Sequence, residues 1–192
     1  MKNLLRSFSI LTFVAFTAAL SFTACSDDDD ENEEETITSS GTATVGGETY
    51  TFSQGILTDY GEQKVNVYTV MLASDGLDYS SYSGTGDALY LQVNTNSSTF
   101  DGGSYTIGTT MEANVIDSAV FVVGVQLPPN EDGTIDTDKT YIPTPGGTVN
   151  ITKSGAVYDI DYNLPCVEIA DGQPIGQDTI VGSYSGELKP GN

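Results

Sequence analysis

The segment AVYDIDYNL, residues 156–164, alternates apolar and polar side chains and decides the fold class. An extended chain points successive side chains to opposite faces, so this period of two predicts a strand with one buried face. The buried set is Tyr158, Ile160, Tyr162 and Leu164, opposed by Val157, Asp159, Asp161 and Asn163. The preceding run GTVNITK, residues 147–153, is joined to it by the turn formers Ser154 and Gly155. Together these two runs predict a hairpin.

Further strand signals repeat along the chain, and no segment has a helical period. Leu89, Leu91 and Val93 are expected to face a core, opposite Tyr90, Gln92 and Asn94. Gly46 and Gly47 join two runs within residues 41–57, as paired glycines do in tight turns. The other expected strands cover residues 63–73, 87–95, 104–109, 118–127 and 179–188.

This spacing predicts one all-β domain over residues 41–192, folded as an antiparallel two-sheet β-sandwich, immunoglobulin-like or jelly-roll-like. A barrel-like relative of the sandwich stays open as an alternative. A membrane-spanning barrel is disfavoured because acidic residues would interrupt its lipid-facing sides. Those residues are Glu112, Asp117, Asp159 and Asp161.

The N-terminus has the order of a secretory signal. Lys2 and Arg6 precede an apolar run at residues 10–20, which is shorter than a comfortable membrane span. An uncleaved anchor is the alternative to removal of residues 1–24. The segment Ser21–Cys25 resembles the lipobox of bacterial lipoproteins, which implies that Cys25 becomes the first mature residue and carries acyl chains such as palmitate. Several acyl chains on one residue hold a protein stably at a membrane.

An acidic run follows Cys25, and its like charges predict an extended, disordered linker through residue 40. One interpretation is that the run only keeps that linker soluble. Its position after the lipobox also resembles the export signal of Bacteroidota surface lipoproteins, which implies an outer-membrane protein exposed at the cell surface. The residues that carry this resemblance are Asp27, Asp28, Asp29, Asp30 and Glu31.

The C-terminal third resembles small Bacteroidota lipoproteins of unknown function. The resemblance rests on glycines and tyrosines of the closing strands and implies fold and compartment, with no catalytic residues. The matching positions are Gly147, Tyr158, Gly172, Gly182, Tyr184, Gly186 and Leu188.

Composition excludes several function classes. The chain has no histidine, so histidine-dependent triads and metal sites are excluded. Its 27 acidic residues against 6 basic ones disfavour nucleic acid and other polyanions as partners. No cofactor is expected. Cys166 is interpreted as a buried thiol, because acylation would consume Cys25, its only conceivable disulfide partner.

Two acidic segments are candidates for a metal site or a catalytic site. Asn130, Asp132 and Asp136 form a weak calcium candidate, but in EF-hand register Pro128 and Lys139 would fall on ligand positions, so an acidic hairpin loop is the favoured interpretation. Asp159 and Asp161 share one strand face and could act as acid and base on a glycoside. Outward aspartates on an antiparallel strand are ordinarily solvated, and this is the favoured interpretation.

The loop DGLDYSSYSGTGD, residues 75–87, has the composition of a recognition loop. Tyr79 and Tyr82 offer amphipathic contact area, while the serines and glycines adapt to a partner. A flexible connection between strands is the alternative. We therefore expect a non-catalytic surface module that binds a protein or glycan; the alternatives are a structural or pilus-like subunit and, with less support, a carboxylate-dependent glycan hydrolase.

Overall fold

The computed structural model describes residues 37–131 and 133–191. The expected signal peptide, Cys25, the acidic residues 27–31 and Asp132 lie outside the described residues. What is predicted for those positions therefore stays a prediction from the sequence.

The described residues are all-β and form twelve strands, as the alternation predicts. No described helix is long and apolar enough to cross a membrane. The first six strands are β1 (Ser40–Val45), β2 (Glu48–Phe52), β3 (Gln54–Glu62), β4 (Asn66–Ala73), β5 (Leu77–Asp78) and β6 (Ser83–Thr95). The others are β7 (Gly102–Ile107), β8 (Val115–Leu127), β9 (Lys139–Pro143), β10 (Thr148–Ser154), β11 (Val157–Ala170) and β12 (Gln173–Pro190).

Hydrogen bonds join these strands into one mixed sheet that closes on itself. The strand order runs β2, β1, β12, β3, β4, β6, β8, β7, β10, β11, β9, and the additional pairs β11–β12 and β8–β9 close the ring. Two pairs are parallel, β3–β12 and β7–β8, so the expectation of a purely antiparallel fold is wrong. The parallel pair β3–β12 is a link within this ring that joins strands from opposite ends of the domain, an arrangement that local alternation does not reveal.

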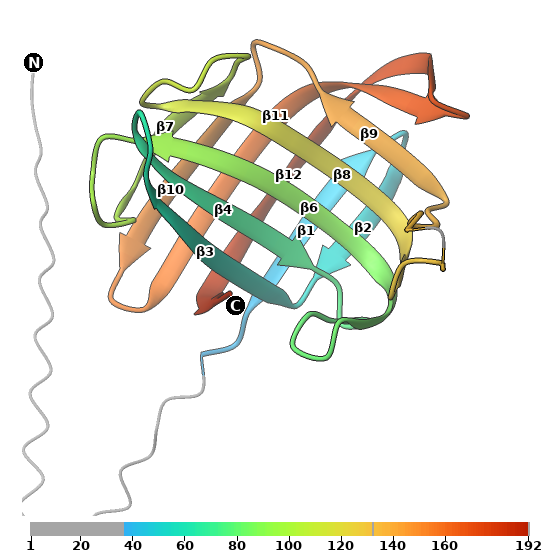
Figure 1. Ribbon diagram of the computed structural model, residues 1–192, viewed down its shortest axis with the longest axis horizontal. Coiled ribbons are helices and arrows are strands. Elements are labelled where there is room, and N and C mark those ends of the chain that lie inside the picture. The colour runs from blue at the N-terminus through green and yellow to red at the C-terminus, as the bar shows by residue number, and fades with distance from the viewer. Residues whose placement is uncertain (1–36, 132, 192) are drawn as a thin grey trace, which may run out of the picture. The chain divides into compact units, whose positions relative to one another are not determined.

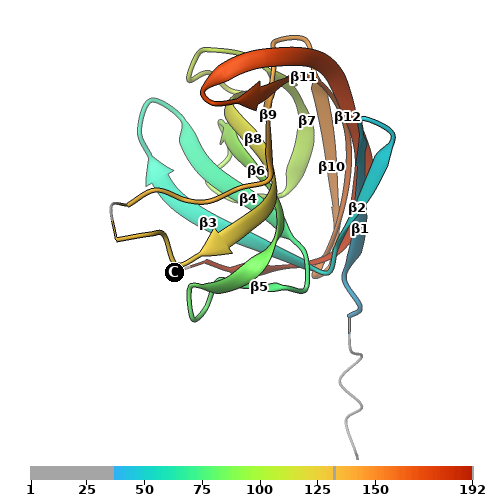
Figure 2. The ribbon, with the colours of Figure 1, turned by 90° about the vertical axis from the view of Figure 1, so that its right-hand side faces the viewer.

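The ring has two halves that lie one in front of the other (Figure 1). We call β3, β4, β6 and β8 the front half, and β1, β12, β11 and β10 the back half. Seen from the side, β9 and β7 lie between the two halves (Figure 2). Each half therefore has an inner face toward the core and an outer face toward solvent.

The core fills the space between the halves with the residues that alternation assigns to the inside. Leu89, Leu91 and Val93 are fully buried, and the β11 set Tyr158, Ile160, Tyr162 and Leu164 is also buried. Phe121 of β8 packs in this core against the rings of Phe52 and Tyr141. These observations confirm the inward-facing residues predicted for β6 and β11.

Glycines of β12 make room for tyrosines in the core. Tyr162 lies opposite Gly182, and its hydroxyl donates a hydrogen bond to the carbonyl oxygen of Thr42 at 2.6 Å. A Cβ atom on Gly182 would clash with that same Thr42 oxygen. The β11–β12 tyrosine and glycine pattern therefore has a packing reason.

Four features of the fold differ from the expectation. The sequence predicts one run over residues 48–57, but Ser53 separates β2 from β3, and the strands β5 and β9 are not predicted. The first strand begins at Ser40, one residue earlier than the expected domain start. Asn94 follows the buried Val93 but is itself fully buried, and neither polar atom of its side chain has a hydrogen-bond partner among the residues that the structure describes.

Candidate functional site

The loop at residues 75–87, which we call the tyrosine loop, folds back closely on β6. Leu77 and Asp78 form β5 and pair with Gly84 and Ser83. The amide of Thr85 donates to the Gly76 carbonyl oxygen at 3.0 Å. Gly84 has a φ of 105°, and a Cβ atom there would clash with the Gly76 carbonyl oxygen. Glycine is therefore required for this close approach.

Asp78 organises the tip of the tyrosine loop. Its carboxylate accepts bonds from the Ser80 amide at 2.8 Å and the Ser80 hydroxyl at 2.6 Å. It also accepts from the Ser81 amide at 3.2 Å and the Ser81 hydroxyl at 2.7 Å. These hydrogen bonds, the Ser80 and Ser81 hydroxyls foremost, hold the pKa of Asp78 well below its usual range because they stabilise the ionised form.

A small apolar cluster lies beneath the loop, separate from the main core. We call it the loop cluster; it consists of Ala73, Leu77, Ala88, Val125 and Leu127. Leu77 is 2% exposed and anchors the loop in this cluster. Gln54 supports the same segment, because its side-chain Nε2 donates to the carbonyl oxygens of Ser74 at 2.9 Å and Leu77 at 2.5 Å. These contacts favour a folded loop over a flexible connection.

The two tyrosines of the loop have different environments. Tyr79 is half-buried against the loop cluster, and burial raises its pKa to about 12. Tyr82 has a positive φ of 52° and is 49% exposed. Tyr79 therefore supports the loop, while Tyr82 presents its ring for contact.

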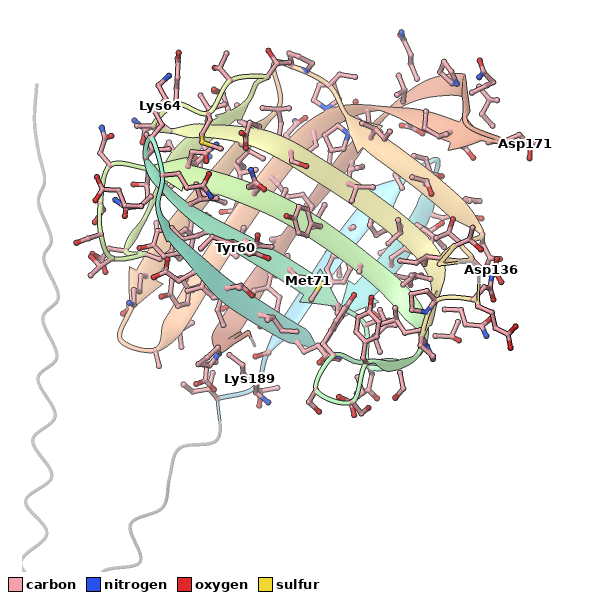
Figure 3. The ribbon with its side chains drawn as sticks, viewed as in Figure 1. Tyr60, Lys64, Met71, Asp136, Asp171 and Lys189 are labelled. Atoms are coloured by element: carbon pink, nitrogen blue, oxygen red, sulfur yellow. The ribbon has the colours of Figure 1, made fainter. Side chains whose placement is uncertain are left out.

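Both tyrosines line a pocket of about 510 Å³, within the size range of ligand sites. Ile56 of β3 pairs with Lys189 of β12 on one side and Met71 of β4 on the other. Met71 lies on the front half, and Lys189 lies near the end of the chain (Figure 3). The lining, which we call the tyrosine pocket, comprises Gln54, Ile56, Thr58, Met71, Asp78, Tyr79, Ser80, Tyr82, Lys189, Pro190 and Gly191.

The sequence analysis selected Tyr79 and Tyr82 but missed the rest of this pocket. Ile56, Met71 and Lys189 meet only because β12 pairs with β3, and β3 with β4. The half-buried Ile56 and Met71 precede buried or core-packed neighbours in their strands, so alternation assigns them to the outer face. That signal could have identified two members of the floor but not the lysine beside them.

A second depression, of about 600 Å³, lies over the back half. It includes Asp159 and Asp161, which are both exposed and have no side-chain hydrogen bond to any other described residue. Neighbouring outward positions carry small hydroxyl side chains, Ser183 and Ser185 among them. Exposed carboxylate and hydroxyl groups of this kind are satisfied by water alone. The tyrosine pocket, which has an ordered loop and partly buried apolar residues, is therefore the stronger candidate for a binding site.

The calcium candidate lies in the loop between β8 and β9. Asn130 and Asp136 are described, and Asp132 is not. The Asn130 side chain donates to the Thr134 hydroxyl at 3.1 Å, and the backbone oxygen of Asp136 accepts from Gln126 at 3.0 Å. Within the described ranges, no three acidic or cysteine side chains gather as metal ligands would. Calcium binding stays a sequence prediction.

Cys166 packs in the main core and is 2% exposed, which confirms the expected buried thiol. Burial raises its pKa to about 11, with a further contribution from nearby Asp178. The side chain is therefore a protonated thiol at neutral pH.

Comparisons with known proteins give no match: no family model, no curated protein and no solved structure resembles this chain significantly. Function must therefore be argued from the site itself.

Proposed function

We propose that this protein is a lipid-anchored outer-membrane surface protein whose β head acts as a non-catalytic binding module for a protein or glycan. The tyrosine pocket carries this proposal. It joins an exposed tyrosine, a half-buried tyrosine and the apolar Ile56 and Met71 with five polar side chains, so it offers both apolar contact area and polar groups that could orient a ligand.

Preorganisation supports binding at this pocket. The tyrosine loop is held by the Asp78 hydrogen bonds, the β5–β6 pair and the buried Leu77. A loop that is already ordered loses little conformational entropy when a ligand binds. The exposed Tyr82 ring offers a face for stacking on a sugar or packing on a peptide side chain.

The fold suits such a module. We infer that the closed ring is a flattened β-sandwich, with the front and back halves as its two layers. The shared core and the facing layers support this class (Figure 2). Connections between strands of a sandwich are common sites of recognition, because a rigid scaffold positions them.

The binding proposal is tested by probing glycan and extracellular-protein arrays with the purified full chain in detergent. Tyr79→Ala with Tyr82→Ala should reduce the signal of any bound probe about tenfold or more, because aromatic anchors dominate binding energy. Asp159→Asn with Asp161→Asn is the matched control on the back half and should leave the signal unchanged. Equal signals from the wild type and the tyrosine variant would reject the pocket as the binding site.

The anchor proposal needs its own test. Mass spectrometry of the mature protein should find acyl chains on Cys25, and Cys25→Ala should move the protein from the membrane to the soluble fraction. Protease added to intact cells should remove the head if it is surface exposed. An unmodified Cys25 thiol at the mature terminus would contradict the anchor, and a head protected on intact cells would contradict surface display.

A further inference from the structure

We propose that the tyrosine pocket takes an acidic monosaccharide unit, with the sugar carboxylate at Lys189 and the ring against Tyr82. This inference rests on the proposed binding function and adds the chemical class of the ligand. It follows from Lys189, the one positively charged residue in the described lining of the pocket, and from the groups that surround it.

Lysines are rare in this protein, and the ion pairs of the described residues use two of them. Lys139 pairs with Glu48 at 2.6 Å, and Lys153 lies 3.6 Å from Asp101. Within residues 37–131 and 133–191, Lys189 and Lys64 have no such partner. Of these two, only Lys189 lines the tyrosine pocket.

Asp78 does not neutralise this lysine. It is the single acidic residue among the described residues that line the pocket, but no ion pair joins it to Lys189. Four hydrogen bonds from Ser80 and Ser81 already engage both of its carboxylate oxygens. The Lys189 ammonium group is thus available for an anionic group of the ligand, and a carboxylate accepts charge-assisted hydrogen bonds from it.

The remaining lining matches a pyranose ring. Tyr82 offers an exposed aromatic face, and Ile56 and Met71 form an apolar floor next to Lys189. Thr58 and Ser80 add hydroxyl groups at the same pocket. A pyranose ring has apolar C–H faces and a hydroxyl rim, so it can use both kinds of surface.

The negative charge of the whole protein limits how many negative charges the ligand can carry. A formal net charge of −21 repels polyanions over distances beyond a single contact. A ligand with one carboxylate on a mostly neutral body gains the Lys189 contact and adds little repulsion. A single terminal acidic sugar therefore fits better than a highly charged polysaccharide.

The test uses titration calorimetry on the full chain in detergent with a matched pair of probes. Methyl β-D-glucuronide carries a carboxylate, and methyl β-D-glucoside is its neutral counterpart. The proposal expects the acid to bind at least about tenfold more tightly, the size expected of a charge-assisted hydrogen bond. Lys189→Gln should abolish that preference, whereas Lys64→Gln, in the turn between β3 and β4, should retain it.

A second probe pair separates sugar acids from peptide acids. An acetylated dipeptide with a free C-terminal carboxylate is compared with its amide. Tighter binding of the peptide acid than of the glucuronide would overturn the sugar assignment. Equal affinity for glucuronide and glucoside, with no effect of Lys189→Gln, would overturn the role of Lys189 and leave the binding function standing. Failure of the arrays to respond to the tyrosine substitutions would instead reject the pocket itself.

Discussion

The two outer faces of this ring are both built from cross-strand rows of outward side chains, and they differ in one apolar row on the front half. On the front half, a cross-strand row runs through Ile56, Met71, Tyr90 and Val120, all partly buried. On the back half, the corresponding rows place Asp159 between Thr152 and Ser185, and Asp161 between Asn150 and Ser183. The front outer face thus has one apolar, partly buried row beside a polar row of Thr58, Thr69, Gln92 and Ser118, whereas these rows of the back outer face are polar and open to water.

This difference identifies the outward side chains that contact with water does not explain. Small polar side chains on an outer face need no partner other than water. A contiguous apolar row on an outer face is more unusual, and here the tyrosine loop covers one end of that face with Leu77 and Tyr79. Function is therefore expected on the front half, beside that loop.

The largest effect should come from removing the anchor of the loop. Leu77→Ala should destabilise the protein by about 2–5 kcal/mol, because it leaves a cavity in the loop cluster. Val181→Ala, at a 48% exposed position on the back half, should change the free energy of unfolding by less than about 0.5 kcal/mol. Urea unfolding of the two variants measures both values, and similar losses would break the distinction between the faces.

A stabilising substitution should also distinguish the faces. Asn94 lies between Val67 and Val115 in the sheet, and its buried amide group has no partner among the described residues. Asn94→Leu should raise the free energy of unfolding by about 1 kcal/mol, because it removes an unsatisfied polar group from an apolar site. Asn163→Leu, exposed on the back half, should have no comparable effect. Thermal or urea unfolding that shows Asn94→Leu to be destabilising would contradict this interpretation.

The smallest effect concerns the pH dependence of the tyrosine loop. The pKa of folded Asp78 lies below its unfolded value of about 4, so its hydrogen bonds are fully kept above that pH. They should be lost only as the pH falls below about 4 toward the lower folded value. The amide resonances of Ser80 and Ser81 report this step by NMR, and Asp78→Asn should remove it. A transition at or above the ordinary aspartate pKa would show that these bonds are absent in solution.

Local chemistry made part of this fold predictable from sequence. Alternation over residues 156–164 predicts an inner and an outer face, because successive side chains of a strand point to opposite faces and apolar ones point to the core. Gly46 and Gly47 form a turn in which both have positive φ, as their pairing indicates. The parallel β3–β12 pair was not predictable, because neither strand carries a local signal of its partner.

The same division applies to the site. Tyr79 and Tyr82 were found because a short loop shows its composition directly. Lys189 was not found because its place beside Ile56 depends on ring closure between distant segments. The burial of Asn94 is likewise not predicted by alternation; its strand neighbours Val67 and Val115 come from other strands, and the Asn114 amide donates to its carbonyl oxygen at 2.8 Å. Alternation predicts which face of the sheet a side chain is on, but not whether other segments cover that face.

The most direct test of the central claim uses the methionine methyl groups of the full chain. Met71 lines the tyrosine pocket, and Met111, in the segment between β7 and β8, is absent from its lining and serves as an internal reference. Carbon-13 methyl spectra are recorded while methyl β-D-glucuronide, methyl β-D-glucoside and the dipeptide acid are added in turn. We predict that at least one probe shifts the Met71 resonance and leaves Met111 unchanged. If a probe binds by calorimetry while the Met71 resonance stays in place, ligand recognition lies elsewhere and the account is contradicted.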